Sequence, residues 1–280
     1  MDVGHGTVRG SWTTVAWCAF SNLPLMKHLI ALITGASSGI GEACAHAFAQ
    51  AGYHTILWAR RSDRLQTLAD TLRSQYNVSV LTHTVDVRDR SQVEVTLGDL
   101  PAEWSNISVL INNAGLSRGL HPFHHGEHAD WEEMIDTNLK GLIYVSRAVL
   151  PGMVERGSGT VINIASIAGL QPYPGGNVYS ATKAAVKMLS DSWQIDLNGT
   201  GVRVTNIDPG LVETEFSDVR FRGDTDRAAT VYKGYQPLTG ADIADVALFA
   251  ATRPAHVSIQ DVLITPTAQA TTTLVRKETL

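Results

Sequence analysis

The sequence predicts a single α/β domain in which a parallel sheet carries helices on both faces, a doubly wound arrangement. Short apolar runs alternate with amphipathic segments of helical length from residue 26 to residue 264, which is the pattern of βαβ units. No linker interrupts this alternation, and 280 residues fit the upper size of one hydrophobic core, about 250–300 residues. Hydrophobic residues make up 44% of the chain and charged residues 18%, which is a globular rather than a disordered composition.

The expected elements follow in order along the chain. Residues 29–34 form an apolar run that predicts a buried strand, and a glycine-rich turn leads from it into a helix over 39–51. Further apolar runs predict strands at 54–59, 78–87, 109–111, 160–165, 202–207 and 258–264. The amphipathic segments between them predict helices at 64–75, 91–100, 131–156, 179–197 and 241–251. Within 131–156 we expect a kink or restart at Pro151, which cannot donate a helical hydrogen bond.

The two ends fall outside this alternation. We expect residues 1–25 to be an N-terminal extension that is disordered or not native, with Met26 as the natural start. Residues 26–266 are expected to form the domain and 267–280 a C-terminal tail. Cys18 and Cys44 are expected to be unpaired in a reducing cytoplasm.

Charge and hydropathy exclude two classes of partner. The net charge of −5 argues against nucleic acid, which usually needs a basic face. The chain lacks the apolar stretch of about 18 residues that predicts a membrane helix. We therefore expect a cytoplasmic protein that binds small molecules, and no residue pattern suggests a metal site.

A glycine-rich turn follows the first strand. The segment Thr34-Gly35-Ala36-Ser37-Ser38-Gly39-Ile40-Gly41 places three glycines between strand and helix. They permit, in order, the tight turn, the close approach of a pyrophosphate and the packing of the helix against the strand. Because the helix N-terminus offers unpaired N–H groups to phosphates, this context predicts a dinucleotide site. The residues assigned to it are Gly35, Ser37, Ser38, Gly39, Ile40 and Gly41.

The end of the second strand indicates which dinucleotide binds. A carboxylate there would accept from the ribose 2′-hydroxyl of NAD, but the sequence has Arg60 and Arg61 instead. Guanidinium groups attract and bind a 2′-phosphate, so these arginines predict NADP. Asp63 is expected to be the N-cap of the second helix rather than a ribose ligand. Asp86 and Val87, at the end of the third strand, are predicted to meet the adenine edge.

Further motifs follow the later strands. They are Asn112-Asn113-Ala114-Gly115, Asn138, Ser166, Tyr179-x-x-x-Lys183 and Pro209-Gly210. Together with the glycine-rich turn they resemble the short-chain dehydrogenase/reductase family, over about residues 27–265. The resemblance implies a Rossmann fold around a seven-stranded parallel sheet. It also implies a homotetramer built on the helices at 131–156 and 179–197 together with the C-terminal segment.

The resemblance assigns a catalytic set of Asn138, Ser166, Tyr179 and Lys183. Tyr179 and Lys183 are four residues apart on one predicted helix and share a face. A nearby ammonium lowers the pKa of a tyrosine from its usual value of about 10, so Tyr179 would exchange the alcohol proton. Ser166 would hydrogen-bond the substrate oxygen, and Asn138 would hold a water of the proton relay. Taken alone, Ser166 would be a turn cap and Asn138 a buried structural amide.

The same resemblance implies further cofactor contacts. Lys183 and Tyr179 would also contact the nicotinamide ribose, and Thr214 would lie near the nicotinamide carboxamide. The remaining cofactor residues are Asn113, Ala114, Gly115, Pro209, Gly210, Val212 and Thr214.

Three segments resemble one subgroup, the NADP-dependent 3-hydroxy acid dehydrogenases. They are residues 150–156, 172–177 and 211–222, the last being the expected substrate lid. The subgroup oxidises L-serine, L-allo-threonine and 3-hydroxypropionate-type acids, and in reverse reduces malonic semialdehyde. The resemblance therefore implies a small hydroxy acid as substrate.

A small hydroxy acid needs a cation for its carboxylate. Arg220 and Arg222 on the lid and Arg118 after the fourth strand are the candidates, because a guanidinium fork matches a carboxylate. The alternative is that they are surface arginines or pair with a lid carboxylate, Glu213 or Asp218. Substrate contacts are assigned to Ser166, Gln171, Tyr179 and Arg220.

Two other functions stay open. One is a carbonyl reductase or 3-oxoacyl-carrier-protein reductase of the same family, although a carrier protein would need an open lid and a basic docking patch. The other is a non-catalytic, cofactor-sensing regulator on the same fold. Such relatives typically lack the tyrosine or the lysine, and this chain has both.

Overall fold

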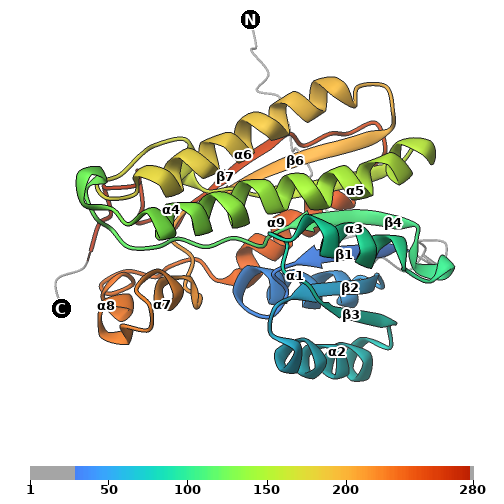
Figure 1. Cartoon of the computed structure of the whole chain (residues 1–280), viewed down its shortest axis with the longest axis horizontal. Helices are drawn as coiled ribbons and strands as arrows, with labels where there is room; N and C mark the ends of the chain where they lie inside the picture. The colour runs from blue at the N-terminus through green and yellow to red at the C-terminus, as the bar shows by residue number, and fades with distance from the viewer. Residues whose placement is uncertain (1–28, 278–280) are drawn as a thin grey trace, which may run out of the picture.

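The computed structural model describes residues 29–277, and its seven strands form one parallel sheet (Figure 1). The strand order is β3-β2-β1-β4-β5-β6-β7, so the predicted doubly wound α/β sheet is confirmed. The strands are β1 (Ile30–Thr34), β2 (His54–Ala59), β3 (Val80–Thr84), β4 (Ile107–Asn112), β5 (Gly159–Ile164), β6 (Val202–Pro209) and β7 (Asp261–Ile264). The expectations for residues 1–25, Met26 and Cys18 lie outside the described residues.

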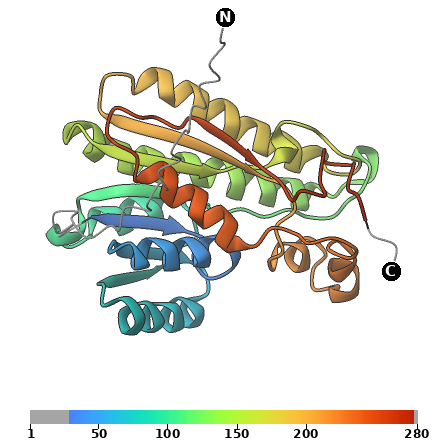
Figure 2. The same ribbon diagram turned by 180° about the vertical axis from the view of Figure 1, so that it is seen from behind.

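Helices cover both faces of the sheet, as Figures 1 and 2 show from opposite sides. One face packs against α1 (Gly39–Gln50), α2 (Ser62–Tyr76) and α9 (Gly240–Ala251). The other packs against α3 (Arg90–Gly98), α5 (Leu142–Glu155) and α6 (Asn177–Asp196), with α4 (His128–Ile135) against α6. Among residues 29–277, none of the helices has both the length and the apolarity that crossing a bilayer requires.

The central strand β1 shows why both faces need helices. Ala31 and Ile33 belong to the core shared with α1 and α9, whereas Ile30 and Leu32 belong to the core shared with α3 and α5. All four side chains are at most 1% exposed. Because successive strand residues point to opposite faces, a strand buried on both sides is apolar at successive positions, as β1 is from Ile30 to Ile33.

The helical segment predicted over 131–156 is interrupted at a different place than expected. A π-helical turn, Asp136–Gly141, joins α4 to α5, and α5 continues through Pro151 without a restart. The predicted restart at Pro151 is wrong because the proline lies on the exposed side of the helix. Pro151 has no N–H to donate to the carbonyl of Arg147, four residues earlier. Arg147 is exposed as well, so water can donate to that carbonyl instead.

The sequence did not predict two short helices after β6: α7 (Phe216–Arg220), within the predicted lid at 211–222, and α8 (Thr225–Thr230), which follows it. Both helices lie beyond one end of the sheet, drawn in orange in Figure 1, and residues 211–230 are called the lid from here on. The segment after β7 also reaches this end: Gln269 Oε1 accepts a hydrogen bond from Leu211 N at 2.8 Å. The lid and the C-terminal segment therefore both border the same edge of the sheet.

Candidate active site

A cavity of about 540 Å³ opens at the carboxyl ends of the strands. The strand order turns back between β1 and β4 there, which is where open α/β sheets bind ligands. The predicted site residues that line it are Gly35, Ser37, Ser38, Gly39, Ile40, Arg60, Arg61, Asp86, Val87, Asn113, Ala114, Gly115, Ser166, Tyr179, Lys183, Pro209, Gly210, Val212, Thr214 and Arg220. Three predicted residues, all in the described part of the chain, are not among the lining residues: Gly41, Asn138 and Gln171.

The glycine-rich turn has a backbone that glycine adopts readily and other residues do not. Gly35 and Gly39 have φ angles of +66° and +60°. Gly41 serves packing instead, because a Cβ there would lie 2.4 Å from the Gly35 carbonyl oxygen and 2.5 Å from Asn113 Nδ2. That same Nδ2 donates to the carbonyls of Thr34 and Gly35, at 3.0 and 3.1 Å. The end of β4 therefore holds the turn after β1 in shape.

The N-terminus of α1 borders the cavity next to this turn. Ser38, at the N-cap, makes no side-chain capping bond with the helix. Its Oγ accepts instead from Arg61 Nη2 at 2.7 Å. The first-turn N–H groups are thus left to a ligand, and their partial positive charge favours a phosphate.

Arg60 and Arg61 follow β2 and line the neighbouring end of the cavity. Arg60 is exposed, whereas Arg61 Nε donates to Ser37 Oγ at 3.2 Å and Arg61 Nη1 pairs with Glu215 Oε2 at 2.9 Å. Two guanidinium groups next to a ribose site are suited to a 2′-phosphate, since each can bind it through parallel N–H donors. The residues present therefore fit NADP.

The prediction that Asp63 caps the second helix is wrong. The N-cap of α2 is Arg61, whose backbone is extended, and the helix begins at Ser62. Arg61 is held in place by its bonds to Ser37 and Ser38, so the helix starts before Asp63 is reached. Asp63 lies in the first turn, where the helix dipole favours a carboxylate.

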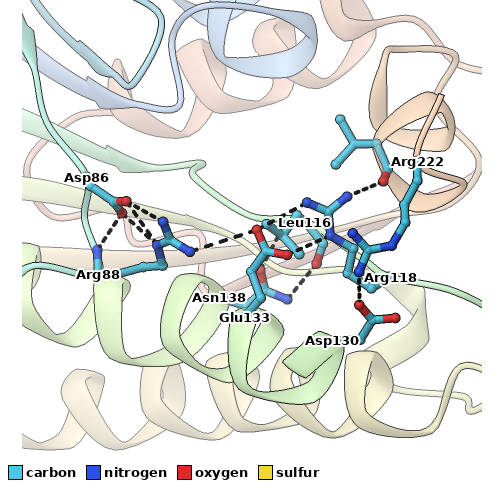
Figure 3. A network of polar contacts seen from close by, with 9 residues as sticks. Asp86, Arg88, Leu116, Arg118, Asp130, Glu133, Asn138 and Arg222 are labelled. Atoms are coloured by element: carbon cyan, nitrogen blue, oxygen red, sulfur yellow. Dashed lines mark hydrogen bonds and ion pairs between the residues drawn. The ribbon is translucent and has the colours of Figure 1, made fainter. Parts of the chain in front are cut away.

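Asp86 lines the cavity after β3 with its carboxylate already engaged. Arg88 Nη2 lies 2.6 Å from Asp86 Oδ2, and Arg88 Nη1 lies 3.8 Å from Glu133 Oε1 (Figure 3). Burial acts to raise the pKa of Asp86, but the hydrogen bonds from Arg88 outweigh it and hold the pKa below its usual value. An ionised carboxylate at this place can accept from an amino group such as that of adenine.

Asn138 lies in the π-helical turn behind the cavity and is 1% exposed. Its Oδ1 accepts from Leu116 N and its Nδ2 donates to the Leu116 carbonyl, both at 2.8 Å (Figure 3). Nδ2 also donates to Thr182 Oγ1 at 3.1 Å. The side chain thus ties the loop after β4 to α6, as expected of a buried structural amide, and its part in a proton relay stays a prediction.

Tyr179 and Lys183 share one face of α6, as predicted, and both are buried. Burial raises the pKa of the Tyr179 phenol to about 12, against the lowering effects of Arg220 and of a hydrogen bond with Ser166. Burial lowers the pKa of Lys183 to about 8. Lys183 Nζ donates to the Ile164 carbonyl at 2.8 Å and lies 6.0 Å from the centre of the Tyr179 ring. The groups that lower the tyrosine pKa are Arg220 and Ser166 rather than Lys183, and burial outweighs both.

Ser166 caps a turn, as one of its two predicted roles requires, and its role towards the substrate stays a prediction. Its Oγ accepts from Ala168 N at 3.1 Å, which caps the short helix after β5. The same hydroxyl is the hydrogen-bonding neighbour of Tyr179. A serine that is fixed by a cap and adjoins the buried phenol can hold a substrate oxygen between the two hydroxyl groups.

Two of the three candidate arginines for a substrate carboxylate are engaged elsewhere. Arg118 Nε lies 2.7 Å from Glu133 Oε2, and its Nη1 donates to the Val219 carbonyl at the end of α7 (Figure 3). Arg222 pairs with Asp130 on α4. Both arginines therefore attach the lid to the body of the domain, and neither lines the cavity.

Arg220 is the candidate that faces the cavity. Its guanidinium carbon lies 5.0, 5.6 and 5.8 Å from the ring centres of Phe216, Tyr179 and Tyr173. Its Nε is buried and has no hydrogen-bond partner among residues 29–277. A buried guanidinium with an unused donor next to the phenol is suited to an anionic ligand.

Three residues that the sequence did not single out also line the cavity: Tyr173, Phe216 and Gln269. Asp208 supports the wall without lining it: it is fully buried near the end of β6, and its carboxylate accepts from Ser166 N at 3.3 Å and from Asn206 Nδ2 at 2.7 Å. Burial raises its pKa above the usual value. The sequence could have pointed to Asp208, because it is an acidic residue near the end of an otherwise apolar strand. No neighbouring residue in the sequence points to Gln269.

Gln171 lies beside the C-terminal segment rather than in the cavity wall. Its Oε1 accepts from Thr272 N at 3.4 Å, and Thr272 lines the cavity. A direct substrate contact by Gln171 stays a prediction. Residues 29–277 contain no group of three or more His, Cys, Asp or Glu side chains placed to hold a metal ion.

Comparisons with known proteins agree with this geometry. The family described as short chain dehydrogenase matches residues 29–224. The NADP-dependent 3-hydroxy acid dehydrogenase YdfG of Salmonella typhi is 52% identical over 242 residues, which are 86% of this chain and 96% of that protein. Sulfoacetaldehyde reductase 2 of Chromohalobacter salexigens is 45% identical over 86% of this chain and 95% of its own length. Among solved structures, the closed form of serine dehydrogenase complexed with NADP+ aligns with a TM-score of 0.84 and 48% identity, covering 90% of this chain and 100% of that one.

Proposed function

The chain belongs to the short-chain dehydrogenase family, and from this premise we propose that it oxidises the 3-hydroxyl of a small hydroxy acid with NADP. The substrates we propose are L-serine, L-allo-threonine and 3-hydroxypropionate, the last giving malonic semialdehyde, which is the substrate of the reverse reaction. The relatives named for 3-hydroxy acid and serine dehydrogenase activity support this choice.

The observation that carries the proposal is the position of Arg220. It is the lid arginine that lines the cavity, its Nε is unused, and its guanidinium carbon lies 5.6 Å from the Tyr179 ring centre. In a 3-hydroxy acid the hydroxyl oxygen is three bonds from the carboxyl carbon, so a carboxylate bound by this guanidinium would bring that hydroxyl to the phenol. Arg220 would thus select small acids over uncharged alcohols.

The buried side chains around Tyr179 supply the proton chemistry. Bound NADP+ supplies the hydride acceptor. Ser166 and Tyr179 hold the substrate oxygen, and the Tyr179 hydroxyl exchanges its proton with it. Because the pKa of Tyr179 is raised to about 12 by burial, tyrosinate needs positive charge close by. Lys183 Nζ and the Arg220 guanidinium carbon lie 6.0 and 5.6 Å from the ring centre.

NADP rather than NAD is the cofactor that the basic end of the cavity fits. Arg60 and Arg61 follow β2, and no carboxylate from the end of that strand is present to bind a free 2′-hydroxyl. The NADP-named relatives support the same choice.

The proposal is tested by kcat/KM for NADP+ reduction with 3-hydroxypropionate, the uncharged 1-propanol and the sulfonate 2-hydroxyethanesulfonate. We expect Arg220→Ala to raise KM for 3-hydroxypropionate about 10- to 100-fold, because a charge-assisted hydrogen bond is lost. The KM for 1-propanol should change little. Arg227→Ala, on the same lid but stacked on Phe221 outside the cavity, is the matched control. Equal losses for the acid and the alcohol would remove Arg220 from this role.

The same assay separates the other functions. Preference for the sulfonate would keep the anion-binding Arg220 but change the substrate, as the similarity to a sulfoacetaldehyde reductase suggests. Faster turnover of a 3-oxoacyl thioester would identify a carbonyl or carrier-protein reductase. Cofactor binding without turnover of any alcohol would identify a cofactor-sensing regulator.

We further propose a homotetramer that acts in the cytoplasm. Exposed apolar residues on α5 and α6, among them Ile143, Met188 and Ile195, support burial against other copies. Cys44 is free and buried, which suits a reducing compartment. Light scattering during gel filtration should give four times the mass of one chain, and a monomer mass would contradict the tetramer.

A further inference from the structure

A carboxylate of the lid reaches across the cavity to the arginines at the β2 end. Glu215, the residue before α7, places Oε2 at 2.9 Å from Arg61 Nη1 and Oε1 at 2.5 Å from Arg64 Nη1. The hydrogen bond from Arg64 is the main cause that holds the pKa of Glu215 below its usual value. The carboxylate is therefore ionised at neutral pH and bridges two guanidinium groups.

These contacts occupy the donors that a 2′-phosphate would use. Arg61 gives Nε to Ser37, Nη2 to Ser38 and Nη1 to Glu215. An outside anion that takes the Nη1 donor now held by Glu215 must displace that carboxylate. Arg64, in the first turn of α2, has its Nη1 on the same carboxylate.

We propose that Glu215 competes with the 2′-phosphate of the cofactor for Arg61 and Arg64, and that Arg64 is a further phosphate-binding arginine. This inference rests on the proposed use of NADP. A carboxylate and a phosphate are both anions that fit the guanidinium fork, so the two compete for the same N–H donors. A ligand without the 2′-phosphate leaves the ion pairs of Glu215 with Arg61 and Arg64 in place, so these pairs do not weaken its binding.

The competition is measured with two adenosine ligands that lack the nicotinamide, by isothermal titration calorimetry at fixed salt. Adenosine 2′,5′-bisphosphate carries the 2′-phosphate, and adenosine 5′-monophosphate does not. We expect Glu215→Gln to bind the bisphosphate about 3- to 10-fold tighter than the wild type, the gain that removal of two partly exposed ion pairs allows. Binding of the monophosphate should not change.

Glu213→Gln is the matched control, because Glu213 lies on the same lid and is exposed. It should leave both ligands at wild-type affinity. Arg64→Gln should weaken the bisphosphate and not the monophosphate. If Glu215→Gln binds the bisphosphate no more tightly than the wild type, the proposed competition is wrong. If Arg64→Gln binds the bisphosphate as tightly as the wild type, Arg64 is not part of the phosphate site.

The wild type separates this inference from the proposed function. If the wild type binds both adenosine ligands equally, the proposed preference for NADP is wrong. If it prefers the bisphosphate but Glu215→Gln does not bind it more tightly, NADP use stands and Glu215 is not a competitor. Equal thermal melting of wild type and variants confirms that the affinities compare folded chains.

Discussion

At the scale of single residues, burial shifts the pKa values of Tyr179 and Lys183 in opposite directions. Burial disfavours the charged form of each, so the pKa of the tyrosine rises to about 12 and that of the lysine falls to about 8. Neither side chain is buried for stability, because each gives up hydration that its partners only partly replace. The proposed proton transfer at the cavity would account for their placement, because a phenol that gives up its proton needs a neighbouring positive charge.

Lys183 should lower the stability of the folded chain in a pH-dependent way. Its folded pKa is about 8 against 10.5 in the unfolded chain, so between these values the unfolded chain binds more protons and stability rises with pH. Below pH 8 the full cost, about 3 kcal/mol, is present. Lys183→Met should therefore be more stable than the wild type at pH 7, with the gain disappearing towards pH 10.5. Urea unfolding across this range measures it.

Lys187→Met, one turn further along α6, is the control for that measurement. Hydrogen bonding to Asp191 is the main cause that raises the pKa of Lys187. Lys187→Met should therefore show no gain in stability that fades between pH 8 and 10.5. A gain for Lys183→Met that is the same at every pH would contradict a buried ammonium at this position.

At the scale of elements, the turn between β1 and α1 depends on close backbone approach. Gly41→Ala would place a Cβ 2.4 Å from the Gly35 carbonyl oxygen, so the helix must shift away from the turn. We expect a loss of about 1–3 kcal/mol in unfolding free energy, as overpacking costs, together with weaker NADP+ binding. Urea unfolding and fluorescence titration with NADP+ measure the two effects.

Gly98→Ala is the matched substitution at the end of α3, where a Cβ would meet no atom within 4 Å. It should be neutral or stabilising by up to about 1 kcal/mol, because alanine is the better helix former. If both variants lost the same stability, the close contact at Gly41 would not be the cause.

The elements that could be predicted from the sequence are those with a repeating apolar pattern. The seven strands and the long helices have one, and they differ from the expectation at their ends and at the π-helical turn that divides the helix predicted over 131–156. The lid helices α7 and α8 have five and six residues, too few for an apolar stripe to show. Distant contacts hold them, such as Ser217 Oγ with the Tyr232 hydroxyl at 2.8 Å, and a local pattern does not contain these contacts.

At the scale of the whole molecule, the site could be predicted because parallel strands end at one edge. Residues that follow six of the strands, β1 to β6, meet in one cavity for that reason. The partners of charged side chains could not be predicted, because they come from far along the chain. Arg222 pairs with a residue 92 positions away, and Gln269 reaches the turn after β6 only once the C-terminal segment folds back.

The central claim is that hydride passes between the C3 carbon of a small hydroxy acid and NADP. The most direct measurement is mass spectrometry of the reduced cofactor after incubation with NADP+ and L-serine that carries deuterium at C3. We expect deuterium on the nicotinamide, and much slower reduction of NAD+ under the same conditions. Reduced cofactor without deuterium, or no reduction with any deuterated 3-hydroxy acid while NADP+ still binds, would contradict the claim.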